Sequence, residues 1–357
     1  MDLSSSRKTL VSLTAALVAG GVLLFAPPGR GQSDTKPVSA ALAWPGAKRG
    51  SLPADLPDGT AFTPDWFVDA STSIGTALSK DGKALRLLIR GTGGALRQFR
   101  QLPISGDVSF PAVTVSGDDV VWAEGHGNRS PQLWTAGLRD SRPPRQITGD
   151  TGDARFYQSE HDLLVADGRV HWVAAAANDG TEVRSVPLAG GPVEVTPQAG
   201  TWQLSAWPWL VDGVTSAAGA TTLRNLTTGQ DVAVPRNDRA VTNCSPTWCR
   251  VVSLTKDGVK IELVHPDGGN RQEVAEGTPE TAITDVGVLD RFEVYALTGG
   301  NADLTGNAGL LIYDLKHKQT VEVSPDAANV VYRGGVLSWS TGTQDLFLRH
   351  SLDLRTV

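Results

Sequence analysis

The sequence predicts an all-β protein whose chain repeats one four-stranded unit. The clearest unit lies in residues 109–148, where the strand-like runs Val120–Glu124 and Gln132–Leu138 are separated by turn-rich segments. Apolar or β-branched markers of the second strand recur every 37 to 50 residues, about 43 on average, at Trp122, Trp172, Thr215, Val252, Tyr295 and Trp339. This period is typical of a propeller blade. It predicts a closed β-propeller of seven blades, with six as the alternative, built from four-stranded antiparallel sheets.

Composition agrees with a turn-rich β-protein. The 357 residues include 39 Gly and 21 Pro but one Met, and Val, Thr and Trp prevail in the apolar runs. The formal net charge is −6 and no basic cluster appears in the sequence. Because a protein that binds phosphates usually carries a basic face, we expect no nucleic-acid partner. We expect a monomer.

The N-terminus has the pattern of an export signal. Arg7 and Lys8 precede an uncharged apolar run over residues 9–26, which Pro27 and Pro28 end. Two interpretations remain open. Residues 1–26 are either a signal anchor, which would hold the protein outside the cytoplasm on the cytoplasmic membrane, or a signal peptide, whose cleavage would release a secreted protein.

The remaining chain divides into a tether and the propeller. Residues 27–60 are rich in Pro, Gly, Ser and Ala and lack periodicity, which predicts a disordered tether. Residues 61–357 form the predicted propeller domain, with its first unit at 71–103 and its last at 327–357. Phe62–Val68 precedes the first unit. We expect this segment to add an outer strand to the last unit and so to clasp the two ends together.

The third and fourth strands carry a recurrent pattern, clearest in residues 223–235 (LRNLTTGQDVAVP) and 311–324 (LIYDLKHKQTVEVS). This pattern resembles the propeller repeats of the TolB family. Together with the export segment and the unit that contains Cys244 and Cys249, it resembles the exported TolB-like propellers of actinobacteria. The resemblance covers residues 61–357. It implies binding and scaffolding at the cell envelope rather than catalysis.

Cys244 and Cys249 are the two cysteines of the chain. Their spacing is wider than that of a C-x-x-C redox motif, and the segment holds no His or further Cys that would complete a zinc site. In an exported protein this predicts a structural disulfide. Free buried thiols and a functional redox pair remain the alternatives.

No catalytic signature is found. The sequence lacks the G-x-S-x-G, H-E-x-x-H, Walker and G-x-G-x-x-G motifs, and its six histidines are scattered. We therefore assign no catalytic residue, no metal and no cofactor.

The most polar connection between units is residues 149–162, GDTGDARFYQSEHD. We expect it at the channel mouth, on the face that also carries residues 126–130 and 299–309. Loops carry polar groups that a packed blade cannot. The candidate ligand contacts are Arg155, Tyr157, Glu160, His161 and Asp162. The alternative is a solvated connection with no ligand.

Tryptophans are densest at Trp202, Trp207 and Trp209. Trp207 and Trp209 share a face if they lie on a strand. Packing between blades is the simpler interpretation, and stacking on a sugar ring is the alternative.

These observations lead to two functional hypotheses. The first is a non-enzymatic propeller, membrane-tethered or secreted, that binds a protein or a cell-envelope polymer. The second is an extracytoplasmic propeller hydrolase or lyase with its site at the channel mouth. Propellers can assemble such a site from residues that are distant in sequence, so a motif search does not decide between the two.

Overall fold

A computed structural model describes residues 37–140, 142–213, 216–217, 219–298, 307–343 and 346–357. The predicted signal or anchor segment, residues 1–26, lies outside this range. Within it the regular secondary structure is almost entirely β-strand, and no helix is long and apolar enough to cross a membrane. Among the described residues, the longest helix is α2 (Ala40–Ala43), with four residues. The same part of the chain contains three short 3-10 helices: Thr92–Gly94, Ile104–Gly106 and Leu354–Thr356.

The strands form consecutive antiparallel sheets, which we number along the chain. Sheet 1 contains β3 (Phe62–Asp69), β4 (Thr72–Leu78), β5 (Ala84–Arg90) and β6 (Leu96–Pro103). Sheet 2 contains β7 (Val108–Ser116), β8 (Asp119–His126), β9 (Arg129–Gly137) and β10 (Arg145–Thr148). Sheet 3 contains β11 (Asp153–Arg155), β12 (Leu164–Ala166), β13 (Arg169–Ala175), β14 (Thr181–Pro187) and β15 (Glu194–Gln198).

The next sheets continue this pattern. Sheet 4 contains β16 (Trp202–Leu204), β17 (Trp209–Asp212), β18 (Thr222–Asn225) and β19 (Asp231–Ala233). Sheet 5 contains β20 (Ala240–Cys244), β21 (Cys249–Thr255), β22 (Gly258–Val264) and β23 (Gln272–Gly277). The last strands are β24 (Pro279–Thr281), β25 (Phe292–Leu297), β26 (Ala308–Asp314), β27 (Gln319–Arg333), β28 (Val336–Thr343) and β29 (Leu346–Asp353).

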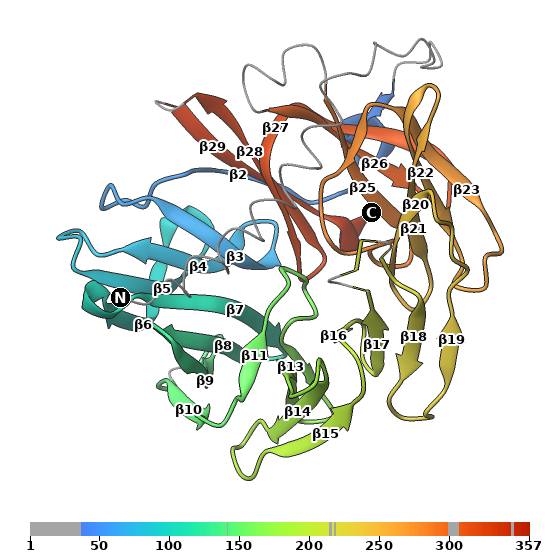
Figure 1. The fold of residues 1–357 in the computed structure, drawn as a ribbon. Helices are drawn as coiled ribbons and strands as arrows, with labels where there is room; N and C mark the ends of the chain where they lie inside the picture. The colour runs from blue at the N-terminus through green and yellow to red at the C-terminus, as the bar shows by residue number, and fades with distance from the viewer. Residues whose placement is uncertain (1–36, 141, 214–215, 218, 299–306, 344–345) are drawn as a thin grey trace, which may run out of the picture.

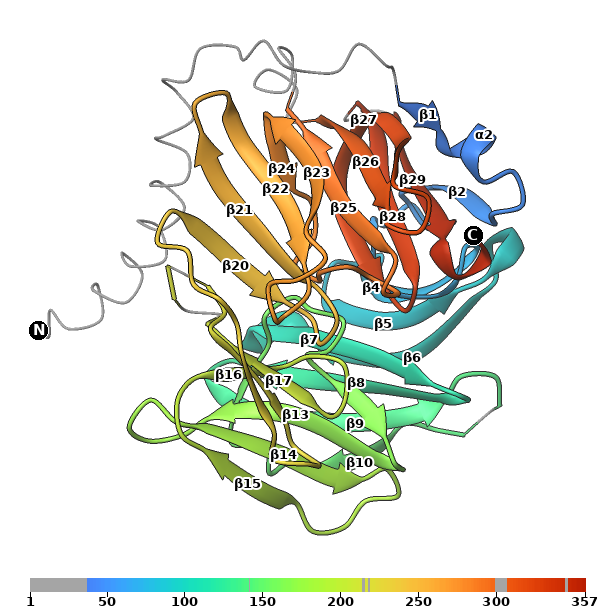
Figure 2. The ribbon, with the colours of Figure 1, turned by 90° about the vertical axis from the view of Figure 1, so that its right-hand side faces the viewer.

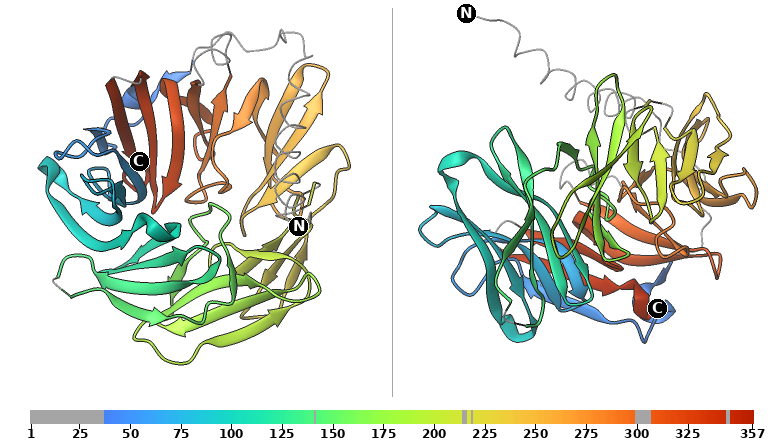
Figure 3. Two further views of the ribbon diagram at one scale, coloured as in Figure 1. Left: turned by 60° about the vertical axis from the view of Figure 1, so that its left-hand side comes forward. Right: turned by 90° about the horizontal axis from the view of Figure 1, so that it is seen from below.

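The long strand β27 serves two sheets. Its residues 319–327 pair with β26, which completes sheet 6 (β24–β27). After a register shift, residues 328–333 pair with β28 and begin sheet 7 (β27–β29). The described strands therefore make seven sheet units, arranged around a common axis (Figures 1, 2 and 3). The all-β class and the four-stranded antiparallel sheets predicted from the repeat are confirmed.

The repeat markers identified in the sequence fill the spaces between sheets. Trp122 of β8 is fully buried against sheet 1, and Trp172 of β13 is fully buried against sheet 2. Large rings at one position of successive units therefore supply a shared core for each pair of neighbouring sheets. The second strand of the fourth unit is β17 (Trp209–Asp212), and the marker assigned to this unit, Thr215, lies outside the described residues.

Arginines on outer strands also join neighbouring sheets. Arg97 of β6 donates to the carbonyl of Gly137 at 2.8 Å, and Arg145 of β10 donates to the carbonyl of Leu188 at 2.8 Å. Both acceptors lie at the end of the third strand of the next sheet or directly after it. Each arginine is a cation that donates hydrogen bonds to backbone carbonyls of the neighbouring sheet. The two arginines therefore strengthen the contacts between sheets 1 and 2 and between sheets 2 and 3 at equivalent places.

Two expectations for the N-terminal part of the domain were wrong. Phe62–Val68 does not clasp the last unit; it lies in β3, the innermost strand of sheet 1, where Phe62, Trp66 and Phe67 are buried. The outer strand of sheet 7 is instead β2 (Arg49–Pro53), which pairs with β29. Residues 37–60 are thus part of the folded domain, and the predicted tether does not extend over them.

We call residues 37–53 the strap, because they run along the outer edges of sheets 6 and 7 (Figure 2). β1 (Val38–Ser39) pairs in parallel with β27, and Trp44 packs edge-on against Phe292 of sheet 6. Gly50 of β2 approaches the first sheet so closely that a Cβ there would lie 2.0 Å from the carbonyl oxygen of Ala70. This position therefore requires glycine, which explains one of the small residues that made the segment resemble a linker.

Hydrogen bonds connect the last sheet to the first. The Ser351 hydroxyl of β29 donates to the carbonyl of Ala70, and Arg355 donates to the carbonyl of Val68 at 2.8 Å. Sheets 1 and 7 are therefore neighbours in space, although they are the first and the last sheet along the chain.

Candidate functional site

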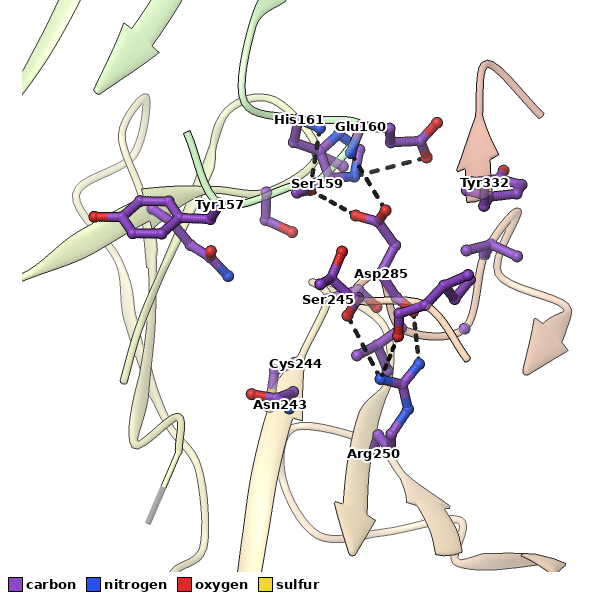
Figure 4. Close-up of a pocket in the computed structure, with 18 of the residues that line it drawn as sticks. Tyr157, Ser159, Glu160, His161, Asn243, Cys244, Ser245, Arg250, Asp285 and Tyr332 are labelled. Atoms are coloured by element: carbon purple, nitrogen blue, oxygen red, sulfur yellow. Dashed lines mark hydrogen bonds and ion pairs between the residues drawn. The ribbon is translucent and has the colours of Figure 1, made fainter. Parts of the chain in front are cut away.

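A cavity of about 810 Å³ lies near the axis. Its walls come from sheets 4 to 7, mainly from the connections between the first and second strand of each sheet, and from a loop of sheet 3 (Figure 4). A volume of this size falls within the range of pockets that hold small ligands, about 300–1,000 Å³.

The loop of sheet 3, residues 156–163, interrupts the innermost strand of that sheet. β11 pairs with Val173–Ala175 of β13, whereas β12 pairs with Arg169–His171 of the same strand. The two short strands thus occupy one edge of β13, and the residues between them bulge out of the sheet toward the axis. We call residues 156–163 the axial loop.

This placement corrects the expected position of the loop. We predicted a rim connection on the face that carries the second-to-third-strand loops, but most of the segment is an insertion within a strand. Its partners at the cavity are first-to-second-strand connections. Residues 299–306, expected to share its face, lie outside the described residues.

The axial loop binds sheet 6 through Asp285. The Ser159 hydroxyl donates to Asp285 Oδ1 at 2.6 Å, and the Glu160 backbone N–H donates to Asp285 Oδ2 at 3.3 Å. In the opposite direction, the Thr284 hydroxyl donates to the carbonyl of Gln158 at 2.7 Å. These contacts join residues separated by about 125 positions in the chain.

The loop also binds sheet 7. The Gly334 N–H donates to Glu160 Oε2 at 3.2 Å, and Arg333 Nη1 lies 3.8 Å from Asp285 Oδ2. A segment of sheet 3 therefore crosses the axis and is fixed to two sheets on the far side.

A buried ion pair positions Asp285. The Arg250 and Glu293 side chains are 1% and 0% exposed, and Arg250 Nε donates to Glu293 Oε1. Arg250 also donates to the backbone carbonyls of Ile283 at 3.1 Å and Asp285 at 2.7 Å. Glu293 Oε2 accepts the Gly287 N–H at 3.0 Å, so the pair determines the path of residues 283–287.

Burial changes the acid–base behaviour of the loop. Burial, and then repulsion from Asp285, raises the pKa of Glu160 to about 8, although Arg333 and the Gly334 N–H oppose the change. Burial lowers the pKa of His161. Burial and the nearby carboxylates Glu160 and Asp285 raise the pKa of the Tyr332 phenol. At neutral pH the Glu160 carboxyl is therefore mostly protonated and can donate a hydrogen bond into the cavity.

The five predicted contact residues separate into three groups. Tyr157, Glu160 and His161 line the cavity. Asp162 is buried and shapes the loop, because its Oδ2 accepts the N–H groups of Tyr157 at 2.8 Å and Ser159 at 3.2 Å. Burial raises the Asp162 pKa to about 6 against these two hydrogen bonds.

Arg155 is the fifth predicted contact, and it lies elsewhere. Its side chain is half exposed in β11, pairs with Asp153 and does not line the cavity. Asp285, Arg333, Tyr332 and Arg250 were missed, because each belongs to another sheet and carries no motif of its own.

Two buried polar atoms at the cavity lack a partner. Among the described residues, neither His161 Nδ1 nor the Tyr332 hydroxyl makes a hydrogen bond. A buried polar group without a partner is unfavourable by about 1–3 kcal/mol, so such atoms commonly meet a water molecule or a ligand. The described residues contain no group of three or more His, Cys, Asp or Glu side chains arranged to hold a metal ion.

The predicted disulfide is present. Cys244 ends β20, Cys249 begins β21, and the two residues face each other in the antiparallel register with their Cα atoms 4.0 Å apart. Cys244 lines the cavity, so the bond fixes part of its wall.

The raised pKa of Glu160 gives a testable pH dependence. A carboxyl whose pKa is higher in the folded than in the unfolded protein contributes stability that is complete below the unfolded pKa and is lost as pH rises through the folded pKa. We expect the melting temperature to fall between about pH 5 and pH 9, and Glu160→Gln to reduce that fall. Melting curves across this range test it.

Asp65 and Asp162 contribute in the same sense, since burial raises the pKa of Asp65 to about 7 and that of Asp162 to about 6. An equally steep fall in Glu160→Gln would contradict the assignment.

Comparison with known proteins supports the fold. No family model matches the chain, and no curated protein matches its sequence. Among solved structures, the chain is similar to a puromycin-hydrolyzing peptidase of Mycobacterium tuberculosis, with 14% identity and a TM-score of 0.54 over 91% of this chain and 54% of that one. The chain thus spans about half the length of the peptidase. It is also similar to the β-propeller domain of the Trilobed protease from Pyrococcus furiosus, with 11% identity and a TM-score of 0.51 over 82% of this chain and 93% of that domain.

These two likenesses show a β-propeller fold. TolB from Acinetobacter baumannii is also among the similar structures, with 12% identity and a TM-score of 0.42 over 74% of this chain and 65% of that one. At these identities the likeness concerns the fold alone.

Proposed function

We propose that this chain is an exported, non-enzymatic binding module, a closed seven-bladed propeller that holds part of a protein or of a cell-envelope polymer in its axial cavity. The observation that carries the proposal is the axial loop. By crossing from sheet 3 to sheets 6 and 7, it gives the cavity a wall that is fixed by hydrogen bonds. Convergence of loops from several sheets on one axial depression is the usual way in which a ring presents a ligand site.

The ionisable groups that hold the cavity walls support binding rather than catalysis. Asp285 accepts hydrogen bonds from Ser159 and from the Glu160 backbone, and Arg250 is paired with Glu293. Glu160 accepts from the Gly334 N–H. These groups hold the walls in place, whereas a catalytic acid or nucleophile has to be free to meet a substrate.

An extracytoplasmic location completes the proposal. The bond between Cys244 and Cys249 fits an oxidising compartment. The apolar segment within residues 1–26 would anchor the protein to the cytoplasmic membrane, and cleavage with secretion is the alternative.

Capture from the native envelope tests the proposed site. We expect the full chain, used as bait, to retain an envelope component, and the pair of changes Glu160→Gln and His161→Ala to reduce the retained amount at least about tenfold, since both side chains line the cavity. Arg155→Ala is the matched control, because it changes a charged residue of the same segment outside the cavity. Equal capture by the double variant, or loss in the control, would refute the site.

One observation favours a second candidate, a propeller hydrolase or lyase. The Glu160 carboxyl, with its pKa of about 8, is protonated at neutral pH beside Asp285 and His161, which is the condition a general acid needs. In that case turnover of a substrate would fall above about pH 8 as Glu160 ionises, and Glu160→Gln would abolish it. If the wild type turns over no substrate and Glu160→Gln only weakens binding, the result supports the first candidate.

A further inference from the structure

We propose that a second cavity, between sheets 7 and 1, binds a small monocarboxylate through Arg349. This cavity has a volume of about 330 Å³, and residues of β3, β27, β28 and β29 line it. Val330 and Val331 line both cavities, and the remaining lining residues differ. The proposal therefore concerns another site than the axial cavity and does not depend on the function proposed above.

Sheet 7 turns a polar face toward sheet 1. Ser338 lies opposite Ser351 in the β28–β29 register, and Ser340 lies opposite Arg349, so these four side chains share one face. The three serines are at most 4% exposed, and the Ser351 hydroxyl donates to the carbonyl of Ala70 in sheet 1. The other face carries Leu337 and Leu352, which belong to the apolar core shared with sheet 6. Small polar side chains thus leave space between sheets 7 and 1, where the second cavity lies.

Arg349 is the charged residue that lines this cavity. It is half-buried, and among the described residues its guanidinium forms no hydrogen bond and no ion pair. Its Nε is buried, so the terminal nitrogens, which retain accessible surface, are the available donors. The Phe347 ring lies 5.7 Å from the guanidinium carbon. Burial, and then repulsion from Arg90, lowers the pKa of Arg349 against the attraction of Asp55 and Asp65. The cation is therefore partly desolvated without a direct partner.

A structural role does not account for this arginine. Other arginines at contacts between segments donate to backbone carbonyls: Arg97 to Gly137 at 2.8 Å, Arg145 to Leu188 at 2.8 Å, and Arg90 to Pro53 at 2.8 Å. Arg349 makes no such bond. A charge that is taken from water without a partner is unfavourable for the free protein, and such groups are frequent at binding sites.

The surroundings select the class of anion. A planar carboxylate accepts two parallel hydrogen bonds from a guanidinium. Pro64, Val330 and Val331 line the same cavity, which suits an apolar body behind the carboxylate. A dianion such as a phosphate monoester would be repelled by Asp55 and by Asp65, whose pKa of about 7 leaves it partly ionised at neutral pH. The volume lies near the lower limit of small-molecule pockets, about 300 Å³, so the ligand is small.

Thermal unfolding of the full chain tests the proposal with three probes: isovalerate, N-acetyl-leucine and the neutral N-acetyl-leucinamide. We expect both acids to raise the melting temperature, by about 2 °C at about ten times their Kd, and the amide to leave it unchanged. Tighter binding of N-acetyl-leucine would indicate the carboxyl terminus of a peptide as the natural source, and tighter binding of isovalerate a free acid. Arg349→Met should raise the Kd of both acids at least about tenfold, because the charged donors are lost.

The variant without ligand separates a binding role from a structural one. Arg349→Met removes a partly desolvated charge and breaks no hydrogen bond, so its melting temperature without ligand should equal or exceed that of the wild type. Arg155→Met is the matched control and should respond to both acids as the wild type does. A clear loss of stability in ligand-free Arg349→Met would show a structural residue. An equal response to the amide, no response to either acid, or an unchanged Kd in Arg349→Met would overturn the site.

Discussion

Replacing Arg250 with Ala is expected to lower the free energy of unfolding by about 3–5 kcal/mol. The change leaves the Glu293 carboxylate, which is 0% exposed, without its partner. It also removes the donors that hold the carbonyls of Ile283 and Asp285. Urea denaturation followed by tryptophan fluorescence measures the loss. Because Asp285 anchors the axial loop, we expect the same variant to weaken capture of the envelope component.

Two control variants test whether the effect of Arg250→Ala comes from the buried ion pair. Arg155→Ala removes a half-exposed arginine that pairs with a surface carboxylate, and we expect a change within about 0.5 kcal/mol. The double change Arg250→Met and Glu293→Leu replaces the ion pair with apolar side chains, and it should recover much of the stability without restoring capture. A loss below about 1 kcal/mol in Arg250→Ala would show that the pair does not hold residues 283–287.

Replacing Trp44 with Ala should lower the free energy of unfolding by a similar amount, about 3–5 kcal/mol. Trp44 is 7% exposed and packs at 5.6 Å, centroid to centroid, on Phe292 of sheet 6. Its removal leaves a cavity beneath the strap and loosens β1 and β2 from sheets 6 and 7. Urea denaturation gives the energy, and limited proteolysis within residues 37–60 shows whether the strap has detached.

Leu42→Ala provides the matched control, because Leu42 lies in the short helix α2 that directly precedes Trp44. Leu42 is 77% exposed, so its truncation should change stability by no more than about 0.5 kcal/mol. If the two variants behaved alike, residues 37–53 would be the tether that the sequence predicted rather than part of the domain.

The repeat could be predicted from the sequence because it reflects a local requirement. Each unit needs a large apolar side chain at one place of its second strand to fill the space beside the next sheet, and Trp122 and Trp172 show this directly. The first unit was placed at residues 71–103, and these bounds leave out its first strand, β3. Alternating apolar residues identify a strand but not its place in the sheet.

The strap was missed for a different reason. Its residues are small or proline because they lie against the outer edges of two sheets, and such a composition also describes a flexible linker. Trp44 was the available signal, since a large aromatic residue is unusual in a linker.

The candidate site could be predicted only in part. Density of polar residues indicated the segment that contains Tyr157, Glu160 and His161, and these residues do line the cavity. The sequence could not show that the segment interrupts a strand, because β11 and β12 have three residues each and no pattern at that length. The partner Asp285 lies about 125 positions away, and only the ring brings it to the axial loop.

A site-specific photo-crosslink tests the central claim most directly. A photoreactive amino acid is placed at Asn243 in the cavity or at Gln101, an exposed residue on the edge strand β6 of sheet 1, and each full-length protein is irradiated in the native envelope. If the axial cavity holds the bound component, position 243 yields an adduct that disappears when Glu160→Gln and His161→Ala are added, and position 101 yields none. An adduct at position 101 alone, or one at 243 that persists in the double variant, would contradict the account.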